Sequence, residues 1–448
     1  MNINEINRID FLGIGGIGMS AIARYLKSIG KEVYGYDKVQ TELTIALENE
    51  GIHVRYTEDP NVLPEKIDLV VITPAIPKDH AEWLHYQNTD IPILKRAEIL
   101  GLISKGRRTI TVAGTHGKTT TSTLLTYILH CSGIKCSAFL GGISVNFDSN
   151  YIQGDCDWVV MEADEYDRSF LQLYPEITIL TSLDADHLDI YGNHNEMIKT
   201  YHKFLSQVQN KIILHQSITA DQYSAQVFTY GSGEGADFQA VGIASDFPGC
   251  RFDFKSDSMQ WEQLKISMAG EHNIENATAA ISVALQLGCS EADIRTALST
   301  FKGIKRRFEW IYSDANFSFI DDYAHHPSEI KAAISAVRLL FPEKKITGIF
   351  QPHLFSRTKD FADGFAQALD SLDQLYLLEI YPAREMPMEG VNSQMLLNKM
   401  HGKHRSLLSK SELMQELKKN KPELLLSLGA GDIGAMVSDI KEKIYLTK

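Results

Sequence analysis

No run of about 20 consecutive apolar residues occurs in the sequence, and the chain has few cysteines and more negative than positive side chains. A membrane-spanning helix needs roughly 20 predominantly apolar residues, so we expect no membrane insertion. The first residues include Glu5, Arg8 and Asp10, a pattern that argues against a secretory signal peptide. The net charge of −13 argues against nucleic acid or an anionic membrane as the main partner.

The five cysteines form no Cys-X-X-Cys pair and lie scattered between Cys131 and Cys289. An odd, dispersed set is typical of reduced thiols, so we expect a cytoplasmic protein. The 448 residues exceed what one ordinary hydrophobic core uses, and we therefore expect two to four domains. The sequence contains no internal repeat that would indicate duplicated domains.

The stretch Thr109–Thr121 has the order of a nucleotide-binding loop. Its β-branched start predicts a buried strand, its Gly-Thr-His-Gly-Lys-Thr centre predicts a tight loop on the surface, and residues 122–130 predict a helix. Such a loop directs backbone N–H groups and a helix N-terminus at one anion. Lys118 would reach the terminal phosphates and the Thr119 hydroxyl would bind Mg²⁺. The loop is two residues shorter than the common phosphate loop, and the alternative is a glycine-rich turn with an incidental lysine.

Acidic residues follow the next two predicted strands, residues 157–161 and 177–180. Glu162 ends the first, and His187 follows the second within an Asp-Ala-Asp-His segment. Ligands of an open parallel sheet bind at the carboxyl ends of its strands, so both side chains would face the loop and could hold Mg²⁺. The alternatives are a solvated acidic run and a hydrogen-bonded structural histidine.

A second glycine-rich turn, Gly13-Ile-Gly15-Gly16-Ile-Gly18-Met19, lies near the N-terminus between a strand and a helix expected at 20–29. A further strand, 32–36, ends at Asp37, near the ribose position of a dinucleotide fold. This pattern favours an NAD site, but any diphosphate ligand can use the same turn.

Residues 226–268 alternate in polarity and predict a small antiparallel insert. Asn273 and Asn276 follow, before a helix expected at 277–287, and their amides would either bind a purine edge or cap the helix.

The last third of the chain contains Lys305-Arg306-Arg307, a candidate phosphate clamp or an exposed basic turn. A strand at 317–320 leads into Asp321-Asp322, and Pro327 suits the first turn of the next helix. A strand at 346–350 leads into a loop that contains Arg357.

The alternation of strands and helices predicts an α/β protein of three domains. We expect an N-terminal Rossmann-like domain at 1–105, a central ATPase-like domain with a mostly parallel sheet and the antiparallel insert at 106–303, and a C-terminal Rossmann-like domain at 304–448.

These motifs resemble those of the Mur ligase family, the ATP-dependent amide-forming ligases of peptidoglycan precursor synthesis. The resemblance spans nearly the whole chain and rests on five motifs in family order: Ala113-Gly-Thr-His-Gly-Lys-Thr-Thr, Glu162-Ala-Asp-Glu, Asp186-His187, His272-Asn-Ile-Glu-Asn276 and Asp322-Tyr-Ala-His-His-Pro327. The first glycine turn, Arg306-Arg-Phe-Glu309 and Phe350-Gln-Pro-His353 resemble the branch that adds L-alanine to UDP-N-acetylmuramate through an acyl phosphate. The alternatives are a recycling ligase that adds a tripeptide, an NAD-binding dehydrogenase and a non-catalytic regulator.

The resemblance implies a set of roles. It implies ATP and Mg²⁺ as cofactors, with Glu162, His187 and Thr119 on the metal. It implies that Lys118, Glu162, His187 and His325 are catalytic. ATP would be bound by Gly114, Thr115, His116, Gly117, Lys118, Thr119, Thr120, Asn276, Arg307 and Asp322. The nucleotide sugar would lie on Gly15, Gly16, Ile17, Gly18, Met19 and Asp37, and the amino acid beside Tyr323, His325 and Arg357. A monomer or homodimer is expected.

The sequence departs from the alanine-adding pattern at two places. Leu354 stands where many members have arginine, and Thr73-Pro-Ala-Ile76 replaces a serine-rich segment. Arg384 is a candidate to supply the missing cation.

Overall fold

The computed structural model describes residues 3–314, 316–383 and 385–446, so Arg384 lies outside the described residues. The chain forms two compact units. The first comprises residues 1–241, 254–261 and 275–301, and the second comprises residues 242–253, 262–274 and 302–448. Among the described residues, no helix is long and apolar enough to cross a membrane.

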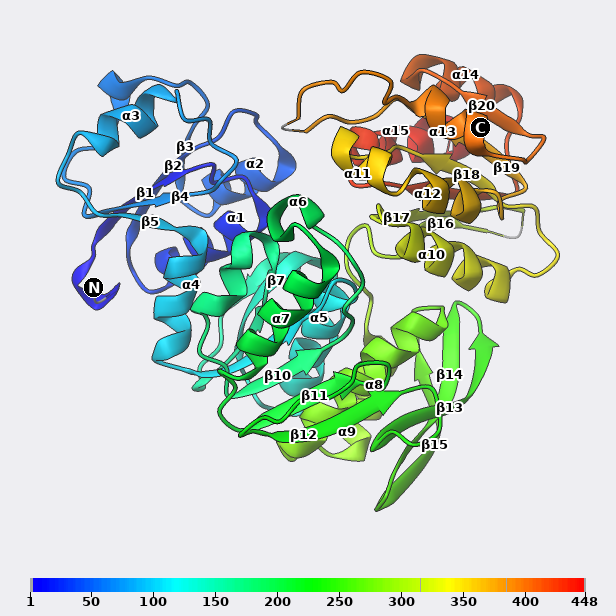
Figure 1. Ribbon diagram of the computed structural model, residues 1–448, viewed down its shortest axis with the longest axis horizontal. Coiled ribbons are helices and arrows are strands. Elements are labelled where there is room, and N and C mark those ends of the chain that lie inside the picture. Colours follow the sequence, from blue (N-terminus) through cyan, green and yellow to red (C-terminus); the bar gives the residue numbers. More distant parts are fainter. Residues whose placement is uncertain (1–2, 315, 384, 447–448) are drawn as a thin grey trace. The chain divides into compact units, whose positions relative to one another are not determined.

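The N-terminal part of the first unit is a five-stranded parallel sheet in the order β3-β2-β1-β4-β5, drawn in blue in Figure 1. Because β1 is central and its neighbours β2 and β4 lie on opposite sides, the turn after β1 opens at a switch point of the sheet. The strands are β1 (Arg8–Leu12), β2 (Glu32–Tyr36), β3 (His53–Arg55), β4 (Leu69–Ile72) and β5 (Ile93–Lys95). The helices are α1 (Ile17–Ser28), α2 (Glu42–Asn49), α3 (Ala81–Gln87) and α4 (Arg96–Lys105).

A ten-stranded sheet in the order β15-β14-β13-β12-β11-β10-β6-β9-β7-β8 forms the centre of the chain. Strand β6 pairs in parallel with β10 on one side and β9 on the other, so the loop after β6 also opens at a switch point. The strands are β6 (Arg108–Ala113), β7 (Ser137–Ser144), β8 (Ser149–Ile152), β9 (Trp158–Glu162), β10 (Ile177–Leu180), β11 (Lys211–His215), β12 (Gln226–Gly231), β13 (Phe238–Asp246), β14 (Gly249–Ser256) and β15 (Met259–Ile266). The helices are α5 (Lys118–Cys131), α6 (Leu188–Tyr191), α7 (His194–Leu205), α8 (Glu271–Gln286) and α9 (Glu291–Thr300).

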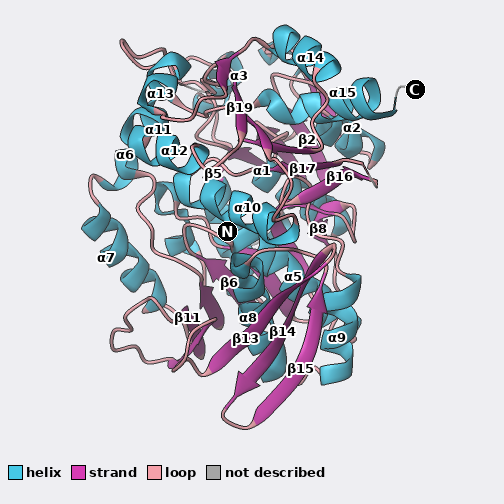
Figure 2. Cartoon of the chain, turned by 90° about the vertical axis from the view of Figure 1, so that its right-hand side faces the viewer, coloured by secondary structure: helices cyan, strands magenta, loops and turns pink. Residues whose placement is uncertain are grey.

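The predicted antiparallel insert begins later than the sequence indicated. Strand β12 pairs in parallel with β11 and continues the central sheet, so assigning residues 226–231 to the insert was wrong. Short connections join β13 to β14 and β14 to β15, and neighbouring strands joined in this way run antiparallel. The long strands of this insert are prominent in Figure 2.

The second unit contains a six-stranded sheet in the order β16-β17-β21-β18-β19-β20, which is parallel except for β16. The strands are β16 (Glu309–Ser313), β17 (Ser318–Asp322), β18 (Thr347–Phe350), β19 (Gln374–Leu377), β20 (Arg405–Leu407) and β21 (Leu424–Leu428). The helices are α10 (Pro327–Leu340), α11 (Phe355–Asp360), α12 (Ala362–Leu369), α13 (Ser393–Lys399), α14 (Lys410–Lys419) and α15 (Met436–Ile440). Pro327 is the first residue of α10, as predicted, because its fixed φ suits a first helical turn.

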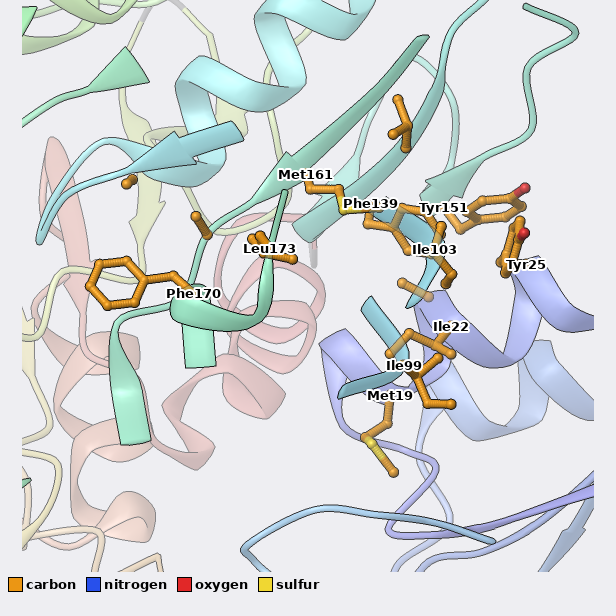
Figure 3. Close-up of a cluster of buried hydrophobic side chains, with 14 of the residues drawn as sticks. Met19, Ile22, Tyr25, Ile99, Ile103, Phe139, Tyr151, Met161, Phe170 and Leu173 are labelled. Atoms are coloured by element: carbon orange, nitrogen blue, oxygen red, sulfur yellow. The ribbon is translucent and has the colours of Figure 1, made fainter. Parts of the chain in front are cut away.

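A continuous apolar core joins the N-terminal sheet's helices to the central sheet within the first unit (Figure 3). Tyr25 of α1 makes edge contacts with Phe139 of β7 and Tyr151 of β8, at ring-centroid distances of 5.5 and 5.9 Å. Ile99 and Ile103 of α4 belong to the same buried cluster. The helix after the first glycine turn is therefore packed directly on the sheet that carries the second glycine loop.

Candidate functional site

The loop between β6 and α5 depends on two glycines with left-handed backbone conformation. Gly114 has φ 124° and Gly117 has φ 81°, values that L side chains rarely adopt. A Cβ atom on Gly117 would lie 2.4 Å from Oδ1 of Asn276. Helix α5 begins at Lys118, four residues before the predicted start, so its free backbone N–H groups open onto the loop.

Hydroxyl groups from the end of β10 hold this loop in place. The Thr115 and Ser182 hydroxyls lie 2.8 Å apart, and the backbone N–H of His116 donates to the Ser182 hydroxyl at 2.9 Å. The His116 ring lies 3.2 Å from the carboxylate of Asp184. The loop is thus preorganised by its neighbour strand, as an anion-binding loop requires.

Lys118 is largely buried, although its loop was expected at the surface. Its Nζ donates to both carboxylate oxygens of Glu165, at 2.9 and 2.8 Å, and to the carbonyl of Gly114 at 2.5 Å. The Lys118 and Glu165 side chains are only 13% and 2% exposed. Burial opposes the charged form of Lys118, but the facing carboxylates of Glu165 and Glu162 outweigh it and raise the lysine pKa.

Glu162 and Thr119 form a pair of oxygen donors beside the loop. The Thr119 hydroxyl donates to Oε2 of Glu162 at 2.8 Å, and the backbone N–H of Gly141 donates to the same oxygen at 3.0 Å. A Cβ on Gly141 would lie 2.2 Å from that oxygen, so glycine is needed for this approach. Mg²⁺ favours oxygen ligands and usually takes one or two from the protein, which fits this pair. The described residues contain no group of three or more His, Cys, Asp or Glu side chains arranged around a metal position.

His187 is the N-cap residue of α6 and has a left-handed backbone, φ 51°. Its Nε2 lies 3.8 Å from Glu165 and 3.7 Å from Asp186, and its ring makes an edge contact with Tyr166. The structure thus brings His187 to the carboxylate that binds Lys118. Its role as a metal ligand stays a prediction.

Asn276 lies inside α8, which begins at Glu271, so the interpretation of Asn273 and Asn276 as helix caps was wrong. The amide oxygen of Asn276 accepts a hydrogen bond from the Thr121 hydroxyl at 3.1 Å. The structure therefore places Asn276 next to the loop, while adenine recognition stays a prediction.

The N-terminal glycine turn is closed by Asp37. Oδ2 of Asp37 accepts a hydrogen bond from the backbone N–H of Gly15 at 2.7 Å, and a Cβ on Gly15 would collide with that oxygen. Helix α1 begins at Ile17, three residues earlier than predicted, so its first backbone N–H groups belong to the turn. The side chain of Met19 is buried in the core, which leaves its backbone as the part that can reach a ligand (Figure 3).

In the second unit, the basic residues of the segment after Gly303 have different roles. Arg306 donates to Asp321 at 3.0 Å and to the carbonyl of Gly429 at 2.6 Å, so it fixes the fold locally. The guanidinium of Arg307 lies over the ring of Tyr323 at 5.1 Å. This segment is therefore neither a simple exposed turn nor a cluster of three equivalent cations.

Asp322 ends β17, and its carboxylate accepts hydrogen bonds from the backbone N–H groups of Phe308 at 2.8 Å and Ala324 at 2.7 Å. Burial raises the Asp322 pKa to about 6, although Arg307 acts in the opposite direction. The carboxylate organises this turn, and its contact with ATP stays a prediction.

His325 follows β17 and Arg357 follows β18, two strands that lie on either side of β21 in the sheet of the second unit. The ring of His325 is 3.3 Å from the carboxylate of Glu329 and 6.4 Å, between centroids, from His353. Burial, assisted by the nearby cation Arg357, lowers the His325 pKa to about 4, although the Glu329 carboxylate acts in the opposite direction. Arg357 lies in α11 and is buried, so its prediction as a loop residue was wrong.

Three family models match the chain. They are described as the Mur ligase family catalytic domain, the Mur ligase middle domain and the Mur ligase glutamate ligase domain, and they match residues 8–108, 112–284 and 306–431. The UDP-N-acetylmuramate–L-alanine ligase of Flavobacterium psychrophilum is 45% identical over 448 residues, which cover 99% of each chain. The chain belongs to the Mur ligase family.

Two solved structures share the fold of this Mur ligase. The UDP-N-acetylmuramate-alanine ligase of Thermotoga maritima is 29% identical, with a TM-score of 0.85 over 98% of this chain and 100% of the other. A murein peptide ligase of Psychrobacter arcticus is 23% identical, with a TM-score of 0.73 over 99% of each chain. These likenesses confirm the predicted α/β class with its three sheets.

Three positioning contacts of this Mur ligase were not predicted from the sequence. The first is that of Glu165, which binds Lys118. The carboxylate of Glu385 accepts hydrogen bonds from the backbone and hydroxyl groups of Ser356, with an N···O distance of 2.9 Å for the backbone bond. It thereby caps α11, whose N-cap residue, Leu354, has no polar side chain. The third contact, between Arg96 and Asp164, joins residues 68 apart. No sequence signal pairs residues at such separations.

Proposed function

We propose that this Mur ligase joins L-alanine to the lactyl carboxylate of UDP-N-acetylmuramate, with ATP as the energy source, in peptidoglycan precursor synthesis. The observation that carries the proposal is the full-length similarity, at 45% identity, to a ligase named for these two substrates. The buried Lys118 in its glycine loop and the adjacent Thr119–Glu162 oxygen pair support the ATP-dependent part of the reaction.

The reaction needs activation because a carboxylate is a poor electrophile for an amine at neutral pH. Transfer of the γ-phosphoryl group to the lactyl carboxylate forms an acyl phosphate, which has a good leaving group. The amine of L-alanine then attacks, and the tetrahedral intermediate collapses to the amide and inorganic phosphate. The first step brings two anions together, so positive charge at the phosphoryl group lowers its barrier.

We assign that charge to Lys118, whose raised pKa keeps it cationic. The loop residues from Gly114 to Thr120 bind the phosphates through backbone N–H groups, and Asn276 lies on the adenine side. Mg²⁺ would be held by Thr119, Glu162 and His187, and it would screen the phosphate charges when bound. Arg307 and Asp322 are assigned to the γ-phosphate and the ribose.

The remaining ligands are assigned to the other two domains. The turn from Gly15 to Met19, closed by Asp37, holds the diphosphate of the nucleotide sugar within a domain of residues 1–105. A central domain, 106–303, binds ATP, and a C-terminal domain, 304–448, binds the amino acid. There, Arg357 holds the alanine carboxylate, because its planar fork matches a carboxylate. Tyr323 borders that pocket.

His325 is assigned to the amino-acid site as a catalytic residue, and its lowered pKa keeps the ring neutral beside the attacking amine. We infer that the protein acts in the cytoplasm, where both nucleotide substrates are available, as a monomer or a homodimer.

The test is release of inorganic phosphate from ATP by the purified full chain with Mg²⁺ and UDP-N-acetylmuramate. L-alanine, glycine, L-serine and the L-alanyl tripeptide are supplied in parallel. The proposal expects release that depends on the nucleotide sugar and is fastest with L-alanine. Turnover with the tripeptide alone would favour the recycling reaction, and turnover of NAD without ATP would favour a dehydrogenase.

A further inference from the structure

Arg96, the first residue of α4, connects the two glycine turns of the first unit. Its guanidinium donates to the carboxylate of Asp164, in the segment after β9. The two side chains are 24% and 35% exposed, so the pair is partly shielded from water. Burial disfavours the charged form of Asp164, but Arg96 and Lys118 outweigh it and lower its pKa.

On its other side, Arg96 packs against the first turn of α1. A Cβ atom added to Gly18 would lie 2.5 Å from Nη1 and 3.1 Å from Cδ of Arg96. Gly18 is the second residue of α1, where free backbone N–H groups form the proposed diphosphate site. The absence of a side chain at Gly18 therefore lets a guanidinium lie against the turn that would bind the nucleotide sugar.

Asp164 lies between two residues of the proposed ATP site. Glu162, two positions earlier, binds the Thr119 hydroxyl, and Glu165, one position later, binds Lys118. The backbone N–H of Tyr166 donates to the other oxygen of Asp164 at 3.0 Å, which fixes the carboxylate within this segment. A displacement of Asp164 would therefore also displace Glu162 and Glu165.

We propose that Arg96 is a positioning residue that couples the two sites, by holding the first turn of α1 against the Glu162–Glu165 segment. When ATP orders the phosphate loop, the ion pair then also orders the turn that binds the nucleotide sugar. Binding of the nucleotide sugar orders the phosphate loop in the same way. This inference rests on the proposed function, which assigns those two ligands. It goes beyond that function by predicting that their affinities depend on each other and that one ion pair carries the dependence.

The chain offers a matched control one residue away. Lys95 forms an ion pair with Asp167 at 3.1 Å, with side chains that are 60% and 41% exposed. Lys95 is the N-cap residue of α4, so this pair also links the start of that helix to the segment after β9, but it is more exposed and lies on no glycine turn. Exposed pairs of this kind contribute little, so Lys95→Ala should leave the coupling intact.

The experiment is calorimetric titration of UDP-N-acetylmuramate into the full chain, with and without a non-hydrolysable ATP analogue and Mg²⁺. The wild type and Lys95→Ala should change their affinity for the sugar nucleotide by at least about fivefold when the analogue is present, within the usual range of coupling between sites. In Arg96→Ala and Asp164→Asn the change should fall below about twofold. The reverse titration must give the same factor, because coupling is reciprocal. Arg96→Lys, which keeps a charge but not the planar fork, should retain part of the effect.

Three results would overturn the inference. The first is a wild type that binds both ligands without coupling. The second is an equal loss of coupling in Lys95→Ala. The third is that Arg96→Ala loses affinity for the sugar nucleotide both with and without the analogue, while Asp164→Asn keeps its affinity and its coupling. Arg96 would then be a direct ligand of the sugar nucleotide. If the wild type does not bind UDP-N-acetylmuramate at all, the proposed function fails as well. Thermal melting of each apo variant separates these outcomes from simple unfolding.

Discussion

Removing the amine of Lys118 should destabilise the first unit as well as stop catalysis. Lys118→Ala leaves Glu165, which is 2% exposed, without the cation that now contacts both of its oxygens. Breaking a buried ion pair by removing one partner costs about 3–5 kcal/mol. We take the lower end of this range, about 3 kcal/mol, because burial already raises the Glu165 pKa and the unpaired carboxyl group can take up a proton.

The assay is differential scanning calorimetry of Lys118→Ala and of the double variant Lys118→Ala/Glu165→Gln. A loss of about 3 kcal/mol should lower the melting temperature by roughly 3–5 °C in a chain of this size, and the double variant should recover most of it because residue 165 no longer carries a buried charge. Both variants should lose at least about a thousandfold in kcat, since neither has the cation at the phosphoryl group. Equal melting temperatures for the wild type and Lys118→Ala would refute the buried pair. Near-normal turnover of either variant would refute the assignment of the phosphate loop.

Three further predictions concern the second unit. Arg357→Ala should raise the KM for L-alanine and leave the KM for ATP nearly unchanged, with a loss of about 2–4 kcal/mol in kcat/KM. The control is Lys359→Ala, at an exposed position of the same helix. Equal effects of Arg357→Ala on both substrates would show that Arg357 is not in the amino-acid site. Glu385→Ala should lower the free energy of unfolding by about 1 kcal/mol, because α11 loses its cap, and should also raise the KM for L-alanine. The variant Glu389→Ala, at an exposed position nearby, should change neither quantity. An unaltered KM in Glu385→Ala would contradict the capping role. For His325, burial lowers the folded-state pKa to about 4 from 6.5, so its contribution to stability is lost as the pH falls from 6.5 toward 4. The wild type should therefore lose about 2–3 kcal/mol relative to His325→Gln between pH 7 and pH 4.5 in chemical denaturation, and parallel pH profiles would show that the ring is not buried in its neutral form.

Local patterns in the sequence predicted the two turns that carry the proposed phosphate sites. The strand before each turn, the glycines within it and the helix after it are neighbours in the chain, so short-range rules apply. Glu162 was correctly placed at the end of its strand for the same reason. The starts of α1 and α5 were predicted three and four residues late, because the first turn of α1 contains Gly18 and that of α5 contains three threonines, which are weak helix formers.

The contacts that position the side chains of these sites could not be predicted from the sequence, because they join segments that are far apart along the chain. The partner of Lys118 is 47 residues away, and only the parallel pairing of β6 with β9 brings Glu165 to it. The pairing of β12 with β11 likewise depends on a strand outside the insert. Arg357 was expected in a loop because α11 has an apolar N-cap residue, and the residue that replaces the cap, Glu385, lies 29 positions from Ser356.

The transfer of an oxygen atom tests the central claim most directly. UDP-N-acetylmuramate labelled with ¹⁸O in both lactyl carboxylate oxygens is incubated with the full chain, ATP, Mg²⁺ and L-alanine, and the phosphate and the amide product are analysed by mass spectrometry. If the carboxylate is activated as an acyl phosphate, one ¹⁸O atom appears in each inorganic phosphate released and the other remains in the amide carbonyl. Amide product accompanied by unlabelled phosphate would contradict the account.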